Sequence, residues 1–450
     1  MSFFPTLSSL QSPLQPASQA QSQGTLAFGV DGVPADGRAL FDLADAPEAG
    51  LWDEMRDAAG LPREPWRRFA ALLPPPPAGE TLAVDLNRRV AQVERQIRLD
   101  GITHNVFNDQ GVAMRPWSLE LLPLLIEPAD WARIEAGAVQ RAQLLESVLA
   151  DTYGAQRLLN DGLLPPALVL RHPGYLRPLR FVSPPGNQRL HIVAFDLTRG
   201  PDGRWWVVAQ RTQGPSGLGY VLHNRIVVSR QFPDAFRELR VQHIASSYRR
   251  MLDTLESMAR DVAGGSTPRV VLLTPGPYSE TYFEHAYLAR YLGVPLVEGG
   301  DLTVRDDRLF LKTVEGLEPV HGLLRRLDDE FCDPLELRPD SALGVPGLLQ
   351  VVRAGRVVMA NALGSGFLES PAVQGFLPGI CRRLLGQDLL LPPLPTGGAA
   401  RRRPGAMCAI SSTTRSCAAP FRAVGARRGC ATRRTRSSTP TPMPGPCKAA

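Results

Sequence analysis

The sequence predicts an α/β protein, because β-rich apolar runs are followed by glycine-containing loops and helical segments. The first such place is residues 203–225, where an apolar run leads into a loop of small residues and then into a helical pattern. The second is a βαβ pattern within residues 266–330, and the third is an apolar run from Val357 that ends in a Gly/Ser loop at Gly366. Ligands bind beyond the carboxyl ends of parallel strands, so these loops contain the candidate site.

The stretch 203–225 is central to this interpretation. Residues 204–209 are predicted to form a buried strand, which the sequence GPSGLG at 214–219 cannot continue, and helical character begins at Tyr220. A ligand could approach backbone N–H groups at Ser216 and Gly217. The alternative is a structural turn between two elements.

The N-terminal half is predicted to be mainly helical after a Ser/Gln/Pro-rich beginning. Most of residues 1–48 is expected to be disordered, and the four prolines at 74–77 are expected to form a linker. Apolar spacing predicts helices at 52–59, 81–98 and 130–154 and a strand at 101–108 that turns at 109–111. Asp130 is the expected N-cap of the third helix, whose apolar residues form a packing face without chemistry.

A hairpin is predicted to precede the loop at 214–219. Residues 191–197 pair with the strand at 204–209 through a turn at Gly200–Gly203. This register places Asp196 beside Ala209–Arg211. Its carboxylate could be a magnesium ligand or could cap a turn.

The βαβ pattern gives the second part of the candidate site. A strand at 269–273 precedes a helix with Ser279 as its expected N-cap and Gly293 at its end, a strand at 294–297 and a hairpin that turns at 306–307. Residues 274–279 and 325–329 should therefore lie around one crevice. The charged residues of the second segment, Arg325, Arg326, Asp328 and Asp329, could bind an anionic substrate and organise a metal, or could form an internal salt-bridge network. Asn361, after the strand at 357–360, is a further candidate contact for a phosphate or substrate.

Several long segments resemble the circularly permuted ATP-grasp type 2 family, which is related to glutathionylspermidine synthetase-like ligases. The resemblance extends from about residue 50 to residue 396. The segments that carry it are WDEM (52–55), RPWSLELLPLLI (115–126), DWARIEAG (130–137), QRLLNDGLLP (156–165), GPSGLGYVLHNR (214–225), LTPGPYSETYFEHAYLARYLG (273–293), LVEGGDLTVRDDRLFLKT (296–313), RRLDDEFCDPLELRPDSALGVPGLL (325–349) and NALGSG (361–366). It implies a permuted ATP-grasp-like core and a Rossmann-like pre-ATP-grasp domain. It also implies ATP- and magnesium-dependent joining of a carboxylate to an amine of a peptide-like substrate through an acyl phosphate.

The resemblance also implies roles for individual residues. The expected catalytic residues are Arg211, Arg325, Arg326, Asp328 and Asp329. The expected ATP contacts are Ser216, Gly217, Asn224, Arg225 and Asn361, and the expected magnesium ligand is Asp196. Ala209-Gln210-Arg211 departs from the family pattern, in which many members carry acidic and amide metal ligands. A non-catalytic homologue that binds a peptide-like ligand is therefore the alternative function.

Charge and composition change abruptly near residue 396. The segment 397–450 contains 11 of the 50 basic residues and none of the 44 acidic ones, and four of the six cysteines lie there without a zinc-binding spacing. We expect a disordered, out-of-frame translation product in place of the C-terminal ATP-binding portion of the ATP-grasp. The alternative is a basic arm for nucleic acid or an acidic surface, although this segment has only one aromatic residue, Phe421.

The predicted domains are a disordered extension (1–48), the N-terminal part of the ATP-grasp core (49–265), the Rossmann-like domain (266–396) and the tail (397–450). The sequence shows no signal peptide and no apolar run long enough for a membrane span, so a cytoplasmic location is expected. The chain contains only two lysines, Lys312 and Lys448.

Overall fold

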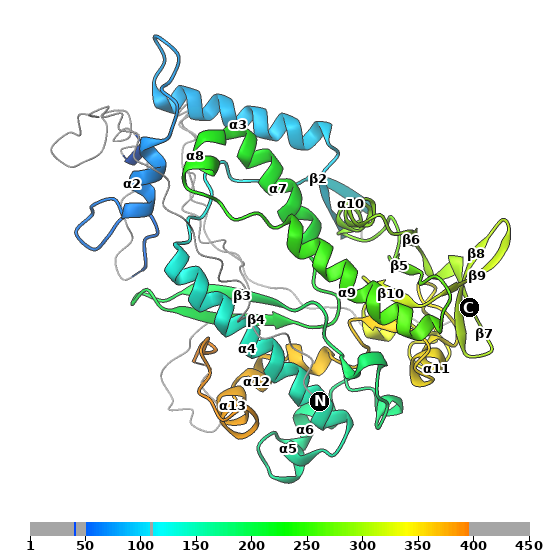
Figure 1. Cartoon of the computed structure of the whole chain (residues 1–450). Helices are drawn as coiled ribbons and strands as arrows, with labels where there is room; N and C mark the ends of the chain where they lie inside the picture. Colours follow the sequence, from blue (N-terminus) through cyan, green and yellow to red (C-terminus); the bar gives the residue numbers. More distant parts are fainter. Residues whose placement is uncertain (1–39, 42–50, 109–110, 396–450) are drawn as a thin grey trace, which may run out of the picture.

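A computed structural model describes residues 40–41, 51–108 and 111–395 (Figure 1). The predictions for residues 1–39, for the turn at 109–110 and for the tail lie outside these residues. Leu40 and Phe41, within the expected disordered extension, are helical and buried in the core. None of the described helices is long and apolar enough to cross a membrane.

A four-stranded parallel sheet lies at the centre of the βαβ region. Its strands stand in the order β11 (Val358–Ala360), β10 (Gly322–Arg325), β5 (Val270–Leu273) and β6 (Leu296–Val297). Alternate side chains enter two separate apolar cores, with Val271 and Leu273 in one and Leu272 in the other. Because both faces are covered, the strands are continuously apolar. The α/β prediction is confirmed.

Helices α9 (Ala245–Ala263) and α10 (Tyr282–Leu292) pack on this sheet, and α10 connects β5 to β6. The predicted end of α10 at Gly293 is confirmed, because Gly293 is its left-handed C-cap. The predicted N-cap is wrong. The N-cap is Thr281, and the Ser279 hydroxyl instead accepts a hydrogen bond from Thr281 N in the preceding turn. Helix α9 precedes the predicted domain boundary at residue 265, although it packs on the sheet that follows this boundary. The boundary itself stays a prediction.

A three-stranded antiparallel meander follows β6. It consists of β7 (Leu302–Arg305), β8 (Arg308–Thr313) and β9 (Gly316–Val320), and the predicted turn at Asp306–Asp307 is confirmed. Helix α11 (Leu348–Arg353) packs against β8. Figure 1 shows this meander at the far end of the molecule from α2 and α3.

The predicted hairpin is present as β3 (Ala194–Arg199) and β4 (Trp205–Arg211), and Asp196 pairs with Ala209 as expected. The prediction of a buried strand is wrong for most of β4. Only Val207 and Gln210 are buried, and Val208 is 44% exposed. The reason is that the hairpin is a sheet of its own. Among the described residues, its outer edge is extended only by the segment around Pro393, through hydrogen bonds of Val207 to Pro392 and Leu394.

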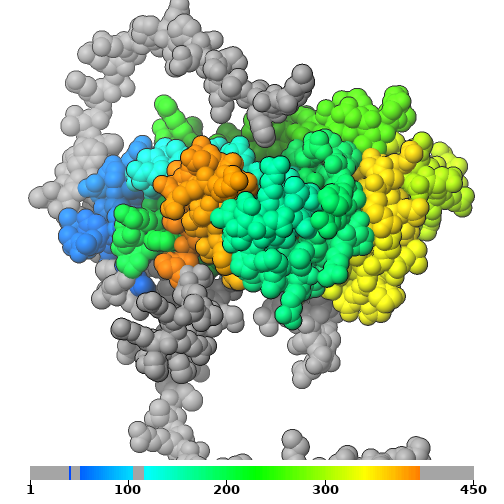
Figure 2. All heavy atoms as spheres, turned by 90° about the horizontal axis from the view of Figure 1, so that it is seen from below, coloured from blue at the N-terminus to red at the C-terminus, as the bar shows by residue number. Residues whose placement is uncertain are grey.

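The long helix α4 (Pro128–Tyr153) crosses this hairpin obliquely in Figure 1, and its Arg141 donates to Gln210 of β4 at 2.9 Å. It begins after Glu127, so Asp130 lies in its first turn and is not the N-cap. Ile134, Leu145 and Val148 are buried as predicted, but Trp131 is 42% exposed. Short helices follow α4 and occur again near the end of the described chain. They are α5 (Arg157–Asn160), α6 (Pro166–Leu170), η1 (Arg177–Leu179), η2 (Pro185–Asn187), α12 (Pro371–Gln374) and α13 (Leu377–Leu385). Figure 2 shows the orange C-terminal segment beside the teal segment that follows α4.

The remaining helices form a layer with its own apolar core. It contains α2 (Glu64–Ala71), α3 (Leu82–Leu99), α7 (Leu218–Gln231) and α8 (Pro233–Glu238), with β1 (Thr103–Asn108) and β2 (Gly111–Pro116) beside them. The helix predicted at 52–59 is wrong. The Asp53 carboxylate accepts hydrogen bonds from Met55 N and Arg56 N at 2.7 and 2.8 Å, and this local pairing replaces a helical turn.

Candidate functional site

The ends of three strands meet in a cluster that we call the polar junction. It is built at the end of β4, at the end of β10 and in the loop after β11, and its members are Thr212, Gln213, Arg325, Asp329, Asn361, Gly364, Ser365 and Glu369. Thr212 N and Gln213 N donate to Glu369 Oε1 at 2.6 and 2.8 Å. The junction therefore holds segments together that are more than 150 residues apart in sequence.

Asn361 is the centre of the junction and is 1% exposed. Its Oδ1 accepts hydrogen bonds from His191 N and Ile192 N at 2.7 and 2.9 Å. Its Nδ2 donates to Ile192 O at 2.6 Å and to Thr212 O at 2.7 Å. Both amide donors and both acceptor positions are thus occupied within the protein. This geometry favours a structural role, and the predicted ligand contact of Asn361 stays a prediction.

Arg325 and Asp329 form a buried ion pair, with Nη2 of the arginine 2.6 Å from Oδ1 of the aspartate. Arg325 also donates to Asn361 O and Leu327 O at 2.9 and 2.6 Å, and Gly364 N donates to Asp329 Oδ2 at 3.0 Å. Burial acts to lower the pKa of Arg325, but the acidic groups around it, Asp329 first among them, together outweigh burial and raise this pKa. The pair fits the internal-network alternative, because neither side chain faces solvent.

Arg326 points to the other side of β10, toward the N-terminus of α7. Its Nη1 donates to Pro215 O, and its Nη2 lies 3.8 Å from Glu284 Oε1. That carboxylate oxygen also accepts hydrogen bonds from Gly217 N at 2.7 Å and Gly219 N at 3.2 Å. Of the charged residues at 325–329, Arg326 thus lies beside the loop that contains Gly217. The N–H of Gly217, however, is already bound by a carboxylate of the protein.

Asp328 is the predicted catalytic residue after β10 that reaches solvent. Burial raises the pKa of its carboxyl, Arg325 opposes this, and the neighbouring charges of Glu369 and Glu330 raise it further. Because Asp328 stands beyond the carboxyl end of a parallel strand, it is placed to meet a ligand at the rim of the polar junction.

Asp196 and Arg211 pair with each other on the hairpin, with Nη2 of the arginine 2.9 Å from Oδ2 of the aspartate. Both side chains are about half exposed. The Arg211 guanidinium thus takes one carboxylate oxygen of Asp196, and its positive charge opposes a metal cation beside the same oxygen. No group of three or more His, Cys, Asp or Glu side chains among the described residues could hold a metal ion. The described residues therefore do not fit a magnesium site at Asp196.

Asn224 and Arg225 are not brought to the junction. Asn224 Oδ1 accepts a hydrogen bond from Trp117 Nε1 at 3.0 Å, and Arg225 donates to Gln242 O at 2.7 Å. Asn224 lies seven positions after Gly217, the N-cap of α7, which is about 10 Å along the helix axis. Our sequence predictions missed two carboxylates that bind the stretch 212–219. Glu369 accepts hydrogen bonds at the beginning of this stretch, and Glu284 accepts them at its end. The only sequence signal for Glu284 is a charge within the aromatic run TYFEHAY.

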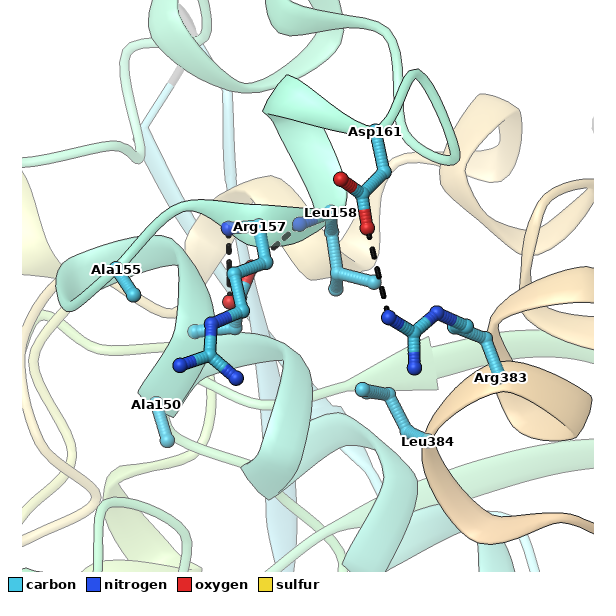
Figure 3. A pocket seen from close by; sticks show the side chains of 8 residues that line it. Ala150, Ala155, Arg157, Leu158, Asp161, Arg383 and Leu384 are labelled. Atoms are coloured by element: carbon cyan, nitrogen blue, oxygen red, sulfur yellow. Dashed lines mark hydrogen bonds and ion pairs between the residues drawn. The ribbon is translucent and has the colours of Figure 1, made fainter.

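A hollow of about 210 Å³ lies elsewhere, between α4, α5 and α13 (Figure 3). Asp161 and Arg383 face each other across it with 3.7 Å between their charged atoms. Asp151 faces the backbone on one side and accepts hydrogen bonds from Arg157 N and Leu158 N, both at 2.9 Å. The hollow is smaller than the usual 300–1,000 Å³ of a small-molecule pocket. Its charges are largely paired within the protein, so it contributes nothing to the candidate site.

Comparison with known proteins gives a family match. The model of the family described as circularly permuted ATP-grasp type 2 matches residues 123–405. An uncharacterized protein of Mycobacterium bovis is 42% identical over 383 residues, which covers 83% of this chain and 42% of that protein. An uncharacterized protein of Synechocystis is 40% identical over 296 residues, which covers 66% of this chain and 61% of that protein. The chain thus spans from under half to under two thirds of the length of these relatives.

A solved structure is also similar in part. It is a glutathione synthetase-like effector from Globodera pallida in its apo form, with a TM-score of 0.45 and 15% sequence identity. The match covers 69% of this chain and 70% of that one.

Proposed function

The chain belongs to the circularly permuted ATP-grasp type 2 family, and we propose that it is a homologue of ATP-dependent carboxylate–amine ligases that act on a peptide-like substrate. In such a reaction a substrate carboxylate accepts the terminal phosphoryl group of ATP to form an acyl phosphate. An amine then displaces the phosphate, so that an amide bond forms. The cytoplasmic location remains part of this proposal.

The observation that carries the proposal is the meeting of three loops at the carboxyl ends of β10 and β11 and the end of β4. Small substrates are bound at such strand ends in α/β folds. We propose that Asp328 binds the amine or another donor group of the substrate. Arg211, which also reaches solvent, would bind a carboxylate. Arg325 and Asp329 would position these loops without touching the substrate.

We further propose that nucleotide binding by this chain is weak. The lysine in the described part of the chain, Lys312 on strand β8, donates to Gly300 O in the turn before β7, away from the polar junction. The described residues also do not fit a magnesium site at Asp196, where Arg211 takes the carboxylate. Lysine acts as a compact positive charge toward phosphate oxygens, and paired arginines do not replace it. The pairing of Arg211 with Asp196 also favours the second candidate, a non-catalytic homologue that binds a peptide-like ligand.

Phosphate release from ATP by the full 450-residue chain tests the proposal, with and without MgCl₂ and with a panel of short peptides and amines. The expected result is release that requires millimolar ATP, a carboxylate and an amine together. Asp328→Asn should lower the rate at least about ten-fold, since a charge-assisted contact is worth about 1.5–3 kcal/mol. Glu330→Gln, which changes an exposed carboxylate two residues away, is the matched control and should change the rate less than two-fold.

One outcome would contradict the ligase proposal, and two others would contradict the roles given to Asp328 and to the nucleotide site. The absence of peptide-dependent release at any ATP concentration, together with retained peptide binding, would establish the non-catalytic alternative. Equal effects of Asp328→Asn and Glu330→Gln would remove Asp328 from the site. Micromolar, magnesium-dependent ATP binding would instead show that the nucleotide site is built from residues other than those of the polar junction and the hairpin.

A further inference from the structure

The N-terminus of α7 already holds a carboxylate. The helix has 14 residues and begins after Gly217. The first N–H groups of a helix have no partner within it, and the helix dipole favours a negative charge beside them. Glu284 of α10 occupies this position with Oε1, which accepts from Gly217 N and Gly219 N at 2.7 and 3.2 Å. Its side chain is fully buried.

A buried cation lies on the other side of the same carboxylate. Arg326 is 2% exposed, and its Nη2 is 3.8 Å from Glu284 Oε1, which is too long for a hydrogen bond. Within the described part of the chain, Nε and Nη2 of Arg326 have no hydrogen-bond acceptor, and Glu284 Oε2 has no donor. Nε and Nη2 form an edge of the guanidinium that can bind an oxyanion through two parallel hydrogen bonds. Buried polar atoms nearly always have a hydrogen-bond partner. The unpaired Nε and Nη2 of Arg326 depart from this rule and leave two donors for an additional acceptor.

We propose that the N-terminus of α7 and Arg326 form an oxyanion-binding site that Glu284 keeps closed. A phosphate or carboxylate group that replaces Glu284 would receive the two backbone N–H groups and the unused edge of Arg326. The oxyanion site is separate from the polar junction, which lies around the side chain of Arg325. The oxyanion site would bind an anion whether or not the chain is a ligase. Phosphate and carboxylate groups are both oxyanions, and the experiment distinguishes them by testing phosphate and acetate salts separately.

Removal of the carboxylate tests the proposal by chemical rescue. Thermal unfolding of the full chain is measured for the wild type, Glu284→Ala and the double variant Glu284→Ala/Arg326→Gln. Each protein is measured in sodium chloride, sodium phosphate and sodium acetate at equal ionic strength and pH. A ligand that binds only the folded state raises the unfolding midpoint with its concentration. Phosphate and acetate separate a phosphate-type ligand from a carboxylate.

For Glu284→Ala, we expect phosphate or acetate to raise the midpoint by about 3 °C or more above chloride at saturation. Half of this rise should occur at a concentration at least ten-fold lower than for the wild type, in which Glu284 competes. The rise should disappear in the double variant. An equal rise in all three proteins, or no rise above chloride in Glu284→Ala, would overturn the proposal.

A second variant covers the case in which Glu284→Ala does not fold in chloride. Glu284→Ser leaves space for an anion and keeps a small polar group, and it is refolded from urea in each of the three salts. The expected result is a folded yield at least three-fold higher in phosphate or acetate than in chloride. The same yield in all three salts would refute the site.

Discussion

Replacement of Asn361 by alanine should be among the most destabilising single changes near the polar junction. The amide makes four hydrogen bonds to the backbone, to His191 N, Ile192 N, Ile192 O and Thr212 O. Thr212 O keeps a second donor, the Ser365 hydroxyl at 2.9 Å. The change therefore leaves three backbone groups without a partner. Each such group costs about 1–3 kcal/mol when buried, and these three are only partly buried. We expect a total loss of about 3–4 kcal/mol.

Urea unfolding followed by circular dichroism and by tryptophan fluorescence measures this loss, and the two probes show whether one transition accounts for it. Asn224→Ala is the matched control, because Asn224 accepts a single hydrogen bond, from Trp117 Nε1. It should cost about 1 kcal/mol or less. A loss below about 1 kcal/mol for Asn361→Ala, or equal losses for the two variants, would refute the claim that Asn361 holds the loops together.

Two further predictions concern burial and packing. His285 is buried between the Thr274 and Thr281 hydroxyls, and burial, with Arg326 adding to it, lowers its pKa to about 3. Between pH 6.5 and about 3 the unfolded state binds one proton more than the folded state. Stability is therefore complete above about pH 6.5 and falls by about 1.4 kcal/mol per unit as pH decreases. His285→Asn should reduce this slope in unfolding titrations between pH 7 and 5, and an unchanged slope would contradict the assignment. Gly219→Ala should cost about 1–3 kcal/mol in urea unfolding, because its Cβ would lie 2.9 Å from Glu284 Cγ and 3.1 Å from Glu284 O. Gly300→Ala, where a Cβ would meet nothing within 4 Å, should cost less than about 0.5 kcal/mol, and a similar loss in both variants would argue against close packing of α7 on α10.

Local structure could be predicted where one physical signal dominated. Helix α3 extends over Leu82–Leu99, as apolar spacing predicted, and the hairpin register of Asp196 with Ala209 followed from the turn at Gly200–Gly203. The family could also be predicted, since long motifs identified it. The helix expected at 52–59 was wrong because a single side chain, Asp53, offers the backbone nearby hydrogen bonds that compete with a helix.

The candidate site could be predicted only as a set of neighbouring loops. The sequence by itself determined that the loops after β4, β10 and β11 carry polar residues, and strand topology implied only that the segments after β5 and β10 lie around one crevice. The loop after β4 belongs to a separate sheet, so its meeting with the others was decided by the tertiary structure. The tertiary structure decided what each charge does. Arg326 is neutralised in part by Glu284, and Thr212 and Gln213 are held by Glu369 from 157 and 156 residues away. The function of a charged side chain depends on its burial and on the charges around it. Those neighbours come from distant segments, so only the folded chain separates buried pairs such as Arg325–Asp329 from a residue that reaches solvent, such as Asp328.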